Sequence, residues 1–183
     1  MEIYLIRHTK PLIDKSICYG QTNVAIDDVS FNISIQSILS QLPDTTDVIY
    51  ASPLIRCSLL ASYLSEYKYN HLNVVYSDLL KEVDFGKWEN NKWDDIDQVD
   101  LQIWMNDFVN KKPHGGENFI ELHQRVKNFL DILTNQSFIS VVIVTHAGVI
   151  RSILSHVNQT LLKDAFSIKC EYGSVIKLKL SGS

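Results

Sequence analysis

Two apolar runs of strand length constrain this chain more than any other feature, because each ends in a polar residue followed by a histidine. Residues 1–6 lead through an arginine into His8, and residues 141–144 lead through a threonine into His146. Both runs predict buried strands. Ligands of an open parallel sheet bind beyond the carboxyl ends of its strands. We therefore expect the two histidines to face one another across a bound ligand.

Length and composition fit a single α/β domain over residues 1–183. Of these residues, 45% are hydrophobic and 21% are charged, which is ordinary for a globular protein with one core. Apolar runs alternate with stretches of helical period, and this order predicts a three-layer α/β sandwich. The expected sheet is mostly parallel, with an antiparallel edge strand at 174–180 and helices on both faces.

Charge and cysteine content limit the kinds of partner and the cellular compartment that we expect for this chain. The net charge of −4 argues against a nucleic-acid partner, which a basic face usually meets. No apolar run approaches the roughly 20 residues that span a bilayer, and the N-terminus reads as a strand rather than a secretory signal. The three cysteines lack the spacing of a metal site or a disulfide framework. We expect a cytoplasmic monomer or homodimer with a small-molecule partner and neither metal nor cofactor.

Several residues predict where helices begin. Ser52 and Pro53 are expected to serve as the N-cap and the first residue of a helix. Residues 93–108 are expected to form one helix. Asn118 and Glu121 have the spacing of a capping box, which predicts a further helix from this point.

Five side chains stand where predicted elements begin or end, and their types suit phosphoryl transfer: Arg7, His8, Arg56, Glu82 and His146. A neutral imidazole is a competent nucleophile at neutral pH. The planar, permanently charged guanidinium of arginine binds phosphate oxygens in pairs. A carboxyl beside the departing oxygen can act as a general acid when it holds its proton. Together these groups indicate transfer of a phosphoryl group to a histidine.

Five sequence blocks around these positions match a known family in its own order. They are LIRHT at 5–9, SPLIRC at 52–57, LKEVDFGKWE at 80–89, GGE at 115–117 and VTHAG at 144–148. The blocks resemble those of the histidine phosphatase (phosphoglycerate-mutase-like) superfamily, from residue 2 to about residue 156. The resemblance implies a hydrolase that needs no metal.

The resemblance also implies a role for each matched position. His8 would be the nucleophile that becomes phosphorylated, while Arg7 and Arg56 would bind the phosphate. His146 would donate a further hydrogen bond to the phosphate. Glu82 would protonate the leaving group and then activate water.

Within the superfamily, the sequence is most similar to the α-ribazole phosphatases of cobalamin biosynthesis. The similar segments are RHTKP at 7–11, CYGQT at 18–22 and WE at 88–89 followed by a second tryptophan. Asn23 and Ala25 depart from that subgroup's pattern, which has Asp and Pro there. The residues expected to contact substrate are Thr9, Gln21, Thr22 and Ala147. The expected activity is hydrolysis of a small phosphorylated metabolite, with α-ribazole-5′-phosphate as the leading candidate.

Other functions stay open. The chain could be a broad-specificity sugar or nucleotide phosphatase. A mutase is less favoured, because residues 84–113 contain no arginine to help retain a bisphosphorylated intermediate. A non-catalytic phosphate-binding module would need neither the nucleophile nor the acid. Asp84 is the alternative to Glu82 as the proton donor.

Overall fold

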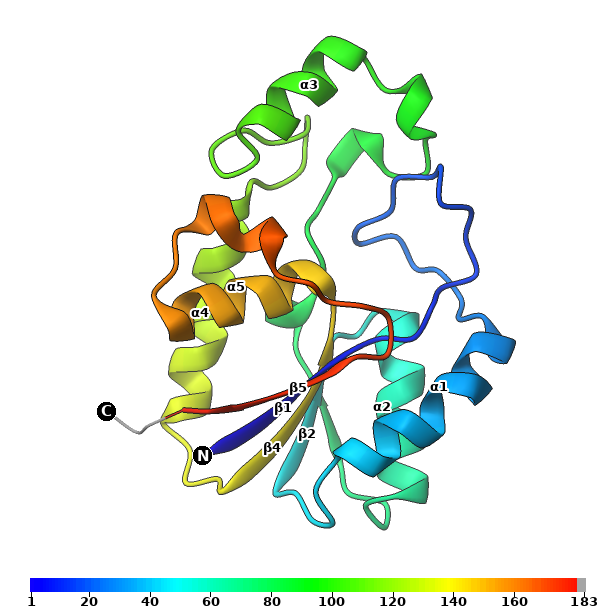
Figure 1. The fold of residues 1–183 in the computed structure, drawn as a ribbon, viewed down its shortest axis with the longest axis vertical. Coiled ribbons are helices and arrows are strands. Elements are labelled where there is room, and N and C mark those ends of the chain that lie inside the picture. Colours follow the sequence, from blue (N-terminus) through cyan, green and yellow to red (C-terminus); the bar gives the residue numbers. More distant parts are fainter. Residues whose placement is uncertain (181–183) are drawn as a thin grey trace.

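A computed structural model describes residues 1–180, and its centre is a five-stranded sheet in the order β3-β2-β4-β1-β5 (Figure 1). The strands are β1 (Glu2–Arg7), β2 (Val48–Ala51), β3 (Val74–Tyr76), β4 (Ser140–Thr145) and β5 (Val175–Lys179). Only β5 runs antiparallel to its neighbour, and it lies at the edge of the sheet beside β1. The predicted fold class and the predicted edge strand are confirmed.

Helices cover both faces of this sheet. The α-helices are α1 (Asp28–Gln41), α2 (Ile55–Tyr67), α3 (Gln98–Asn106), α4 (Phe119–Thr134) and α5 (Ala147–Asn158). Four short 3₁₀ turns complete the set: η1 (Asp78–Leu80), η2 (Gly86–Trp88), η3 (Trp93–Asp95) and η4 (Leu162–Ser167). Helices α1 and α2 pack on one face and α4 and α5 on the other, while α3 stands beyond the end of the sheet (Figure 1).

The strands that precede the two histidines are direct neighbours. β1 and β4 are parallel and pair in a register that places Arg7 opposite Thr145. The backbone N–H of His8 extends this ladder by donating to Thr145 O at 3.0 Å. Both strands therefore end at the same edge of the sheet, where ligands of such sheets bind.

The predicted start of α2 is wrong. Ser52 and Pro53 precede the helix, which begins at Ile55 after an extended Leu54 that supplies no side-chain cap. The Ser52 hydroxyl instead lies 2.8 Å from His146 Nε2. The Ser52 hydroxyl also accepts from Leu54 N at 3.3 Å, so it closes a local turn before the helix instead of capping the first turn of α2.

The predicted helix at 93–108 is divided in two. η3 is separated from α3 by Ile96 and Asp97, and α3 ends at Asn106. The Asp97 carboxylate accepts hydrogen bonds from Val99 N at 2.9 Å and Asp100 N at 3.1 Å. An N-cap at this position starts a new helix rather than continuing an old one. The capping box that opens α4, by contrast, is present as predicted.

The three cysteines, Cys18, Cys57 and Cys170, are buried and unpaired. Across residues 1–180, every helix falls short of the length and apolar character required to cross a bilayer.

Candidate active site

The two predicted histidines meet at the carboxyl edge of the sheet. His8 follows β1 and His146 follows β4, and their ring centroids are 5.1 Å apart with an interplanar angle of 63°. Both side chains are buried. The structure thus brings together two imidazoles that are far apart in the sequence.

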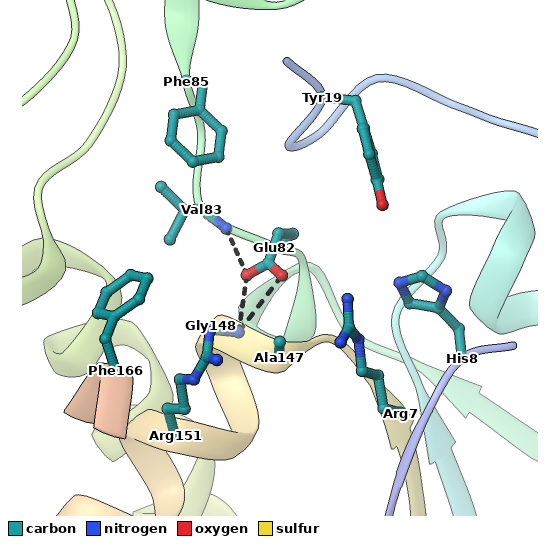
Figure 2. Close-up of a pocket in the computed structure, with 10 residues that line it drawn as sticks. All are labelled: Arg7, His8, Tyr19, Glu82, Val83, Phe85, Ala147, Gly148, Arg151 and Phe166. Atoms are coloured by element: carbon teal, nitrogen blue, oxygen red, sulfur yellow. Dashed lines mark hydrogen bonds between the residues drawn. The ribbon is translucent and has the colours of Figure 1, made fainter. Parts of the chain in front are cut away.

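A cavity of about 200 Å³ opens beside His8 (Figure 2). It is lined by Arg7, His8, Tyr19, Glu82, Val83, Phe85, Ala147, Gly148, Arg151 and Phe166. Four of the predicted site residues are among these: Arg7, His8, Glu82 and Ala147. The other predicted residues lie outside the lining: Thr9, Gln21, Thr22, Arg56 and His146.

Hydrogen bonding fixes the proton on His8. Its Nδ1 lies 2.7 Å from Thr9 O, and a carbonyl oxygen can only accept, so Nδ1 carries the proton and Nε2 keeps a lone pair. Burial, followed by the positive charges of Arg56 and Arg7, holds the pKa of His8 well below its usual range, although the bond to Thr9 opposes this. The ring is therefore a neutral imidazole with Nε2 unprotonated.

His146 is a second neutral imidazole. Burial is the main cause that lowers its pKa well below the usual range, and the charge of Arg56 adds to it. Its Nε2 lies 2.8 Å from the Ser52 hydroxyl and 3.4 Å from Cys57 Sγ. These contacts hold the His146 ring in one orientation next to His8.

Backbone carbonyls hold both arginines. Arg7 Nη1 donates to Cys170 O. Arg56 is fully buried, with Nη1 donating to Thr22 O at 2.8 Å and Nη2 donating to Gly20 O. Each guanidinium is thus anchored through its terminal nitrogens.

Three polar groups around His8 are buried without a hydrogen-bond partner among residues 1–180: Arg7 Nε, Arg56 Nε and Thr9 Oγ1. Unpaired buried donors are rare and need an explanation. Two permanently charged N–H groups and a hydroxyl are suited to an anion. Within the same described residues, no group of three or more His, Cys, Asp or Glu side chains is placed to hold a metal ion.

The carboxylate of Glu82 lies at the start of α5, within the cavity (Figure 2). Its Oε1 accepts from Val83 N at 3.0 Å and Gly148 N at 3.1 Å, and Oε2 lies 3.3 Å from Gly148 N. A Cβ on Gly148 would collide with Oε1, so this close approach requires glycine. Asp84, the alternative acid, bonds the backbone N–H of Gly86 at 2.7 Å and does not line the cavity.

Gln21 and Thr22 support the site rather than line it. Their backbone N–H groups donate to the carboxylate of Glu89 at 2.8 and 2.6 Å, and Gln21 Nε2 donates to Glu82 O at 3.2 Å. Burial raises the pKa of Glu89, but hydrogen bonds from Thr22, Gln21 and Phe85 outweigh it and lower the pKa overall. The two predicted substrate contacts therefore hold the loop that carries the carbonyl partners of Arg56.

Arg151 and Phe166 are cavity residues that sequence reasoning missed. The Arg151 guanidinium lies over the Phe166 ring, 4.8 Å from its centroid, and its Nε donates to Ile168 O at 3.2 Å. Figure 2 shows Arg151 directed toward the cavity. The available signal was its spacing, because Arg151 follows Ala147 by four residues and so shares its face of α5.

A family model for the histidine phosphatase superfamily (branch 1) matches residues 3–183. Phosphoserine phosphatase 1 of Hydrogenobacter thermophilus is 29% identical over 132 residues, 70% of this chain and 62% of that protein. Adenosylcobalamin/alpha-ribazole phosphatase of Escherichia coli is 32% identical over 80 residues, 42% of this chain and 39% of that protein. The matched segments thus span less than two thirds of either relative's length.

A solved structure gives the same fold along nearly the whole chain. The alpha-ribazole phosphatase from Shigella flexneri superposes with a TM-score of 0.89 at 23% identity, covering 99% of this chain and 91% of that one. The family match and the shared fold agree with the order of the five sequence blocks. This chain belongs to the histidine phosphatase superfamily.

Proposed function

We propose that this chain is a metal-independent phosphomonoesterase that acts through a phosphohistidine at His8. The observation that carries the proposal is the group of unpartnered buried donors, Arg7 Nε, Arg56 Nε and Thr9 Oγ1, around a neutral imidazole. The donors suit a phosphate, and the free lone pair on Nε2 of His8 suits attack on phosphorus.

In the first half of the proposed reaction, His8 Nε2 attacks phosphorus while the bond to the alcohol oxygen breaks. Arg7 and Arg56 stabilise the charge on the three equatorial oxygens through donors already fixed in place. Glu82 passes its proton to the departing oxygen, so the alcohol leaves neutral. The products are the free alcohol and phosphohistidine.

In the second half, water attacks phosphorus and its proton passes to the Glu82 carboxylate. The bond between His8 Nε2 and phosphorus breaks, inorganic phosphate leaves, and both residues return to their starting states. His146 is proposed to donate to a phosphate oxygen, a role consistent with its place next to His8, at 5.1 Å between ring centroids.

The leading candidate substrate is α-ribazole-5′-phosphate. The cavity volume lies below the 300–1,000 Å³ typical of sites that enclose a drug-sized ligand, so it suits the phosphoryl group and the adjoining part of the ester. Phe85 and Phe166 form aromatic walls beside Glu82, where a flat leaving group would lie. Relatives and fold neighbours with this activity support the same candidate.

Phosphoserine is the second candidate, and Arg151 is the observation that favours it. The guanidinium directed into the cavity could bind the carboxylate of a small amino acid. Phosphoserine phosphatase 1 is also among the relatives.

A mutase would need cationic side chains to retain a bisphosphorylated intermediate. Besides Arg7, the cavity lining has one further cationic side chain among residues 1–180, Arg151. None of Lys87, Lys92, Lys111 and Lys112 lines the cavity, and Lys112 pairs with Glu121 at 2.7 Å. This placement supports hydrolysis over transfer.

The test is hydrolysis of p-nitrophenyl phosphate with and without EDTA, followed by α-ribazole-5′-phosphate and L-phosphoserine. We expect turnover that EDTA leaves unchanged. We also expect a kcat/KM for α-ribazole-5′-phosphate that is at least about tenfold higher than that for L-phosphoserine. Loss of turnover in EDTA would contradict the metal-independent mechanism. Phosphate binding without turnover of any ester would instead favour a non-catalytic binding module.

Because the pKa of His8 lies below its usual range, its imidazole should stay neutral at pH 6.5, the ordinary histidine value. We expect the ¹⁵N signals of the His8 ring to keep their neutral-imidazole positions at this pH and to move only in more acidic solution. Half-titration at or above pH 6.5 would contradict the assignment. Below pH 6.5 the histidine of the unfolded chain takes up a proton before the buried histidine of the folded chain does. The free energy of unfolding should therefore decrease as the pH is lowered below 6.5, by up to about 1.4 kcal/mol per pH unit for each histidine with a lowered pKa.

A further inference from the structure

Each arginine of the site lies near a tyrosine ring, and the two tyrosines bond to one another. Tyr172 lies over the Arg7 guanidinium, 3.7 Å from its Cζ to the ring centroid, and the corresponding distance from Arg56 to Tyr19 is 5.4 Å. The hydroxyls of Tyr19 and Tyr172 are 2.6 Å apart. The reaction steps described above use neither tyrosine.

The turn before β5 fixes Tyr172 relative to the end of β1. Gly173 N donates to Arg7 O at 3.1 Å and to His8 O at 3.2 Å, and Arg7 Nη1 donates to Cys170 O in the same turn. Gly173 has φ +71°, which glycine adopts without strain. Tyr172 is therefore set against Arg7 and His8 by the backbone on both sides of it.

The Tyr172 ring restrains Arg7 without using its donors. All guanidinium N–H groups lie in the plane of the group, and the ring covers a face of that plane. With Nη1 bonded to Cys170, the buried Nε of Arg7 stays free for an anion. The Tyr172 ring centroid also lies 5.5 Å from that of His8, so one ring borders both the arginine and the imidazole.

Tyr19 holds Tyr172 from the other side. Burial is the main cause that raises the pKa of the Tyr19 hydroxyl, so this hydroxyl keeps its proton in the contact with Tyr172. Tyr19 lines the main cavity, and both tyrosines line a second hollow of about 30 Å³ that also contacts Lys10 and Lys15. The pair is thus a wall at the edge of the phosphate site.

We propose that Tyr172, held by the Tyr19 hydroxyl, is a positioning residue that keeps the Arg7 guanidinium in the plane required to bind the transferred phosphoryl group. The proposal rests on the proposed phosphomonoesterase function. The aromatic face of Tyr172 provides most of this positioning of Arg7, and the bond between the two tyrosine hydroxyls makes a smaller, supporting contribution.

The test compares Tyr172→Leu, Tyr172→Phe and Tyr19→Phe, with Tyr67→Leu as the control at an exposed tyrosine of α2. Tyr172→Leu is expected to lower kcat/KM for p-nitrophenyl phosphate about tenfold and to weaken inorganic phosphate binding, measured by calorimetry, by a similar factor. Tyr172→Phe, which keeps the ring, should stay within about threefold of the parent. Tyr19→Phe should behave like Tyr172→Phe, and Tyr67→Leu should change neither quantity.

A double-mutant cycle with Arg7→Lys separates positioning from general destabilisation. If Tyr172 acts through the guanidinium, Tyr172→Leu should have little further effect in the Arg7→Lys background. Additive losses would overturn the proposal, as would a Tyr172→Phe variant as impaired as Tyr172→Leu. If the parent protein hydrolyses no ester, the proposed phosphomonoesterase function is wrong. Inorganic phosphate binding by the same variants would still test whether Tyr172 positions Arg7.

Discussion

Replacement of His8 by glutamine is expected to lower kcat/KM for p-nitrophenyl phosphate by about 10⁴-fold or more. The lone pair of the glutamine amide nitrogen is delocalised into its carbonyl group, so it cannot attack phosphorus. Glutamine is close in size to histidine, and its N–H can still donate to Thr9 O, the partner of His8 Nδ1. The loss should therefore be chemical rather than structural. It is measured by initial rates in EDTA, with unfolding midpoints recorded for both proteins.

The matched control is His156→Gln, at an exposed histidine of α5 that lies outside the cavity lining. This variant should keep the activity of the parent. Rapid alkaline quench, which spares the acid-labile bond between phosphorus and the imidazole nitrogen, should trap labelled phosphate on the parent and on His156→Gln, but not on His8→Gln. A His8→Gln protein that retains more than a few per cent of the parent's kcat/KM would refute the nucleophile assignment.

Glu82→Gln is expected to slow hydrolysis most for those esters whose leaving groups depart poorly unless they are protonated. Removal of a general acid typically costs about 10²–10⁴-fold. An alkyl phosphate should show a loss in this range, whereas p-nitrophenyl phosphate, whose phenolate leaves without protonation, should lose far less. Glutamine keeps an oxygen to accept from Val83 N and Gly148 N, so the side chain should stay in place.

Asp84→Asn is the control for this prediction, since Asp84 is the neighbouring carboxylate and bonds only backbone. It should affect the alkyl and aryl esters equally, if at all. Equal losses on both esters for Glu82→Gln would mean that Glu82 positions the substrate rather than donating a proton. A dependence on the leaving group in Asp84→Asn would move the acid role to that residue.

The sheet could be predicted from the sequence because its strands carry their own signal. β1 and β4 are continuous apolar runs, as buried parallel strands require, and β5 alternates apolar residues with lysine, as a half-exposed edge strand does. The ends of helices were less predictable where a side chain had two possible partners. Serine is a common N-cap residue, but the bond that Ser52 makes to His146 depends on a residue 94 positions away.

Some residues of the candidate site could likewise be predicted from the sequence, and others could not. His8 and His146 could be located because each directly follows a strand, and Glu82 because it lies in a block that matches the family. Tyr172 and Phe166 could not, because their place depends on how the segment after α5 folds back over the end of β1. Sequence reasoning also could not distinguish Thr22 as a support from Thr22 as a substrate contact, since both roles suit a polar loop residue.

The position of β1 in the sheet has a consequence for how the protein matures. β1 is far in the sequence from both strands that pair with it, β4, residues 140–145, and β5, residues 175–179. During synthesis, residues 2–7 therefore stay unpaired until both of these later segments have been translated. Until then His8 has no pocket around it. Hydrolytic competence should thus arrive only after β5 has left the ribosome, rather than growing during synthesis.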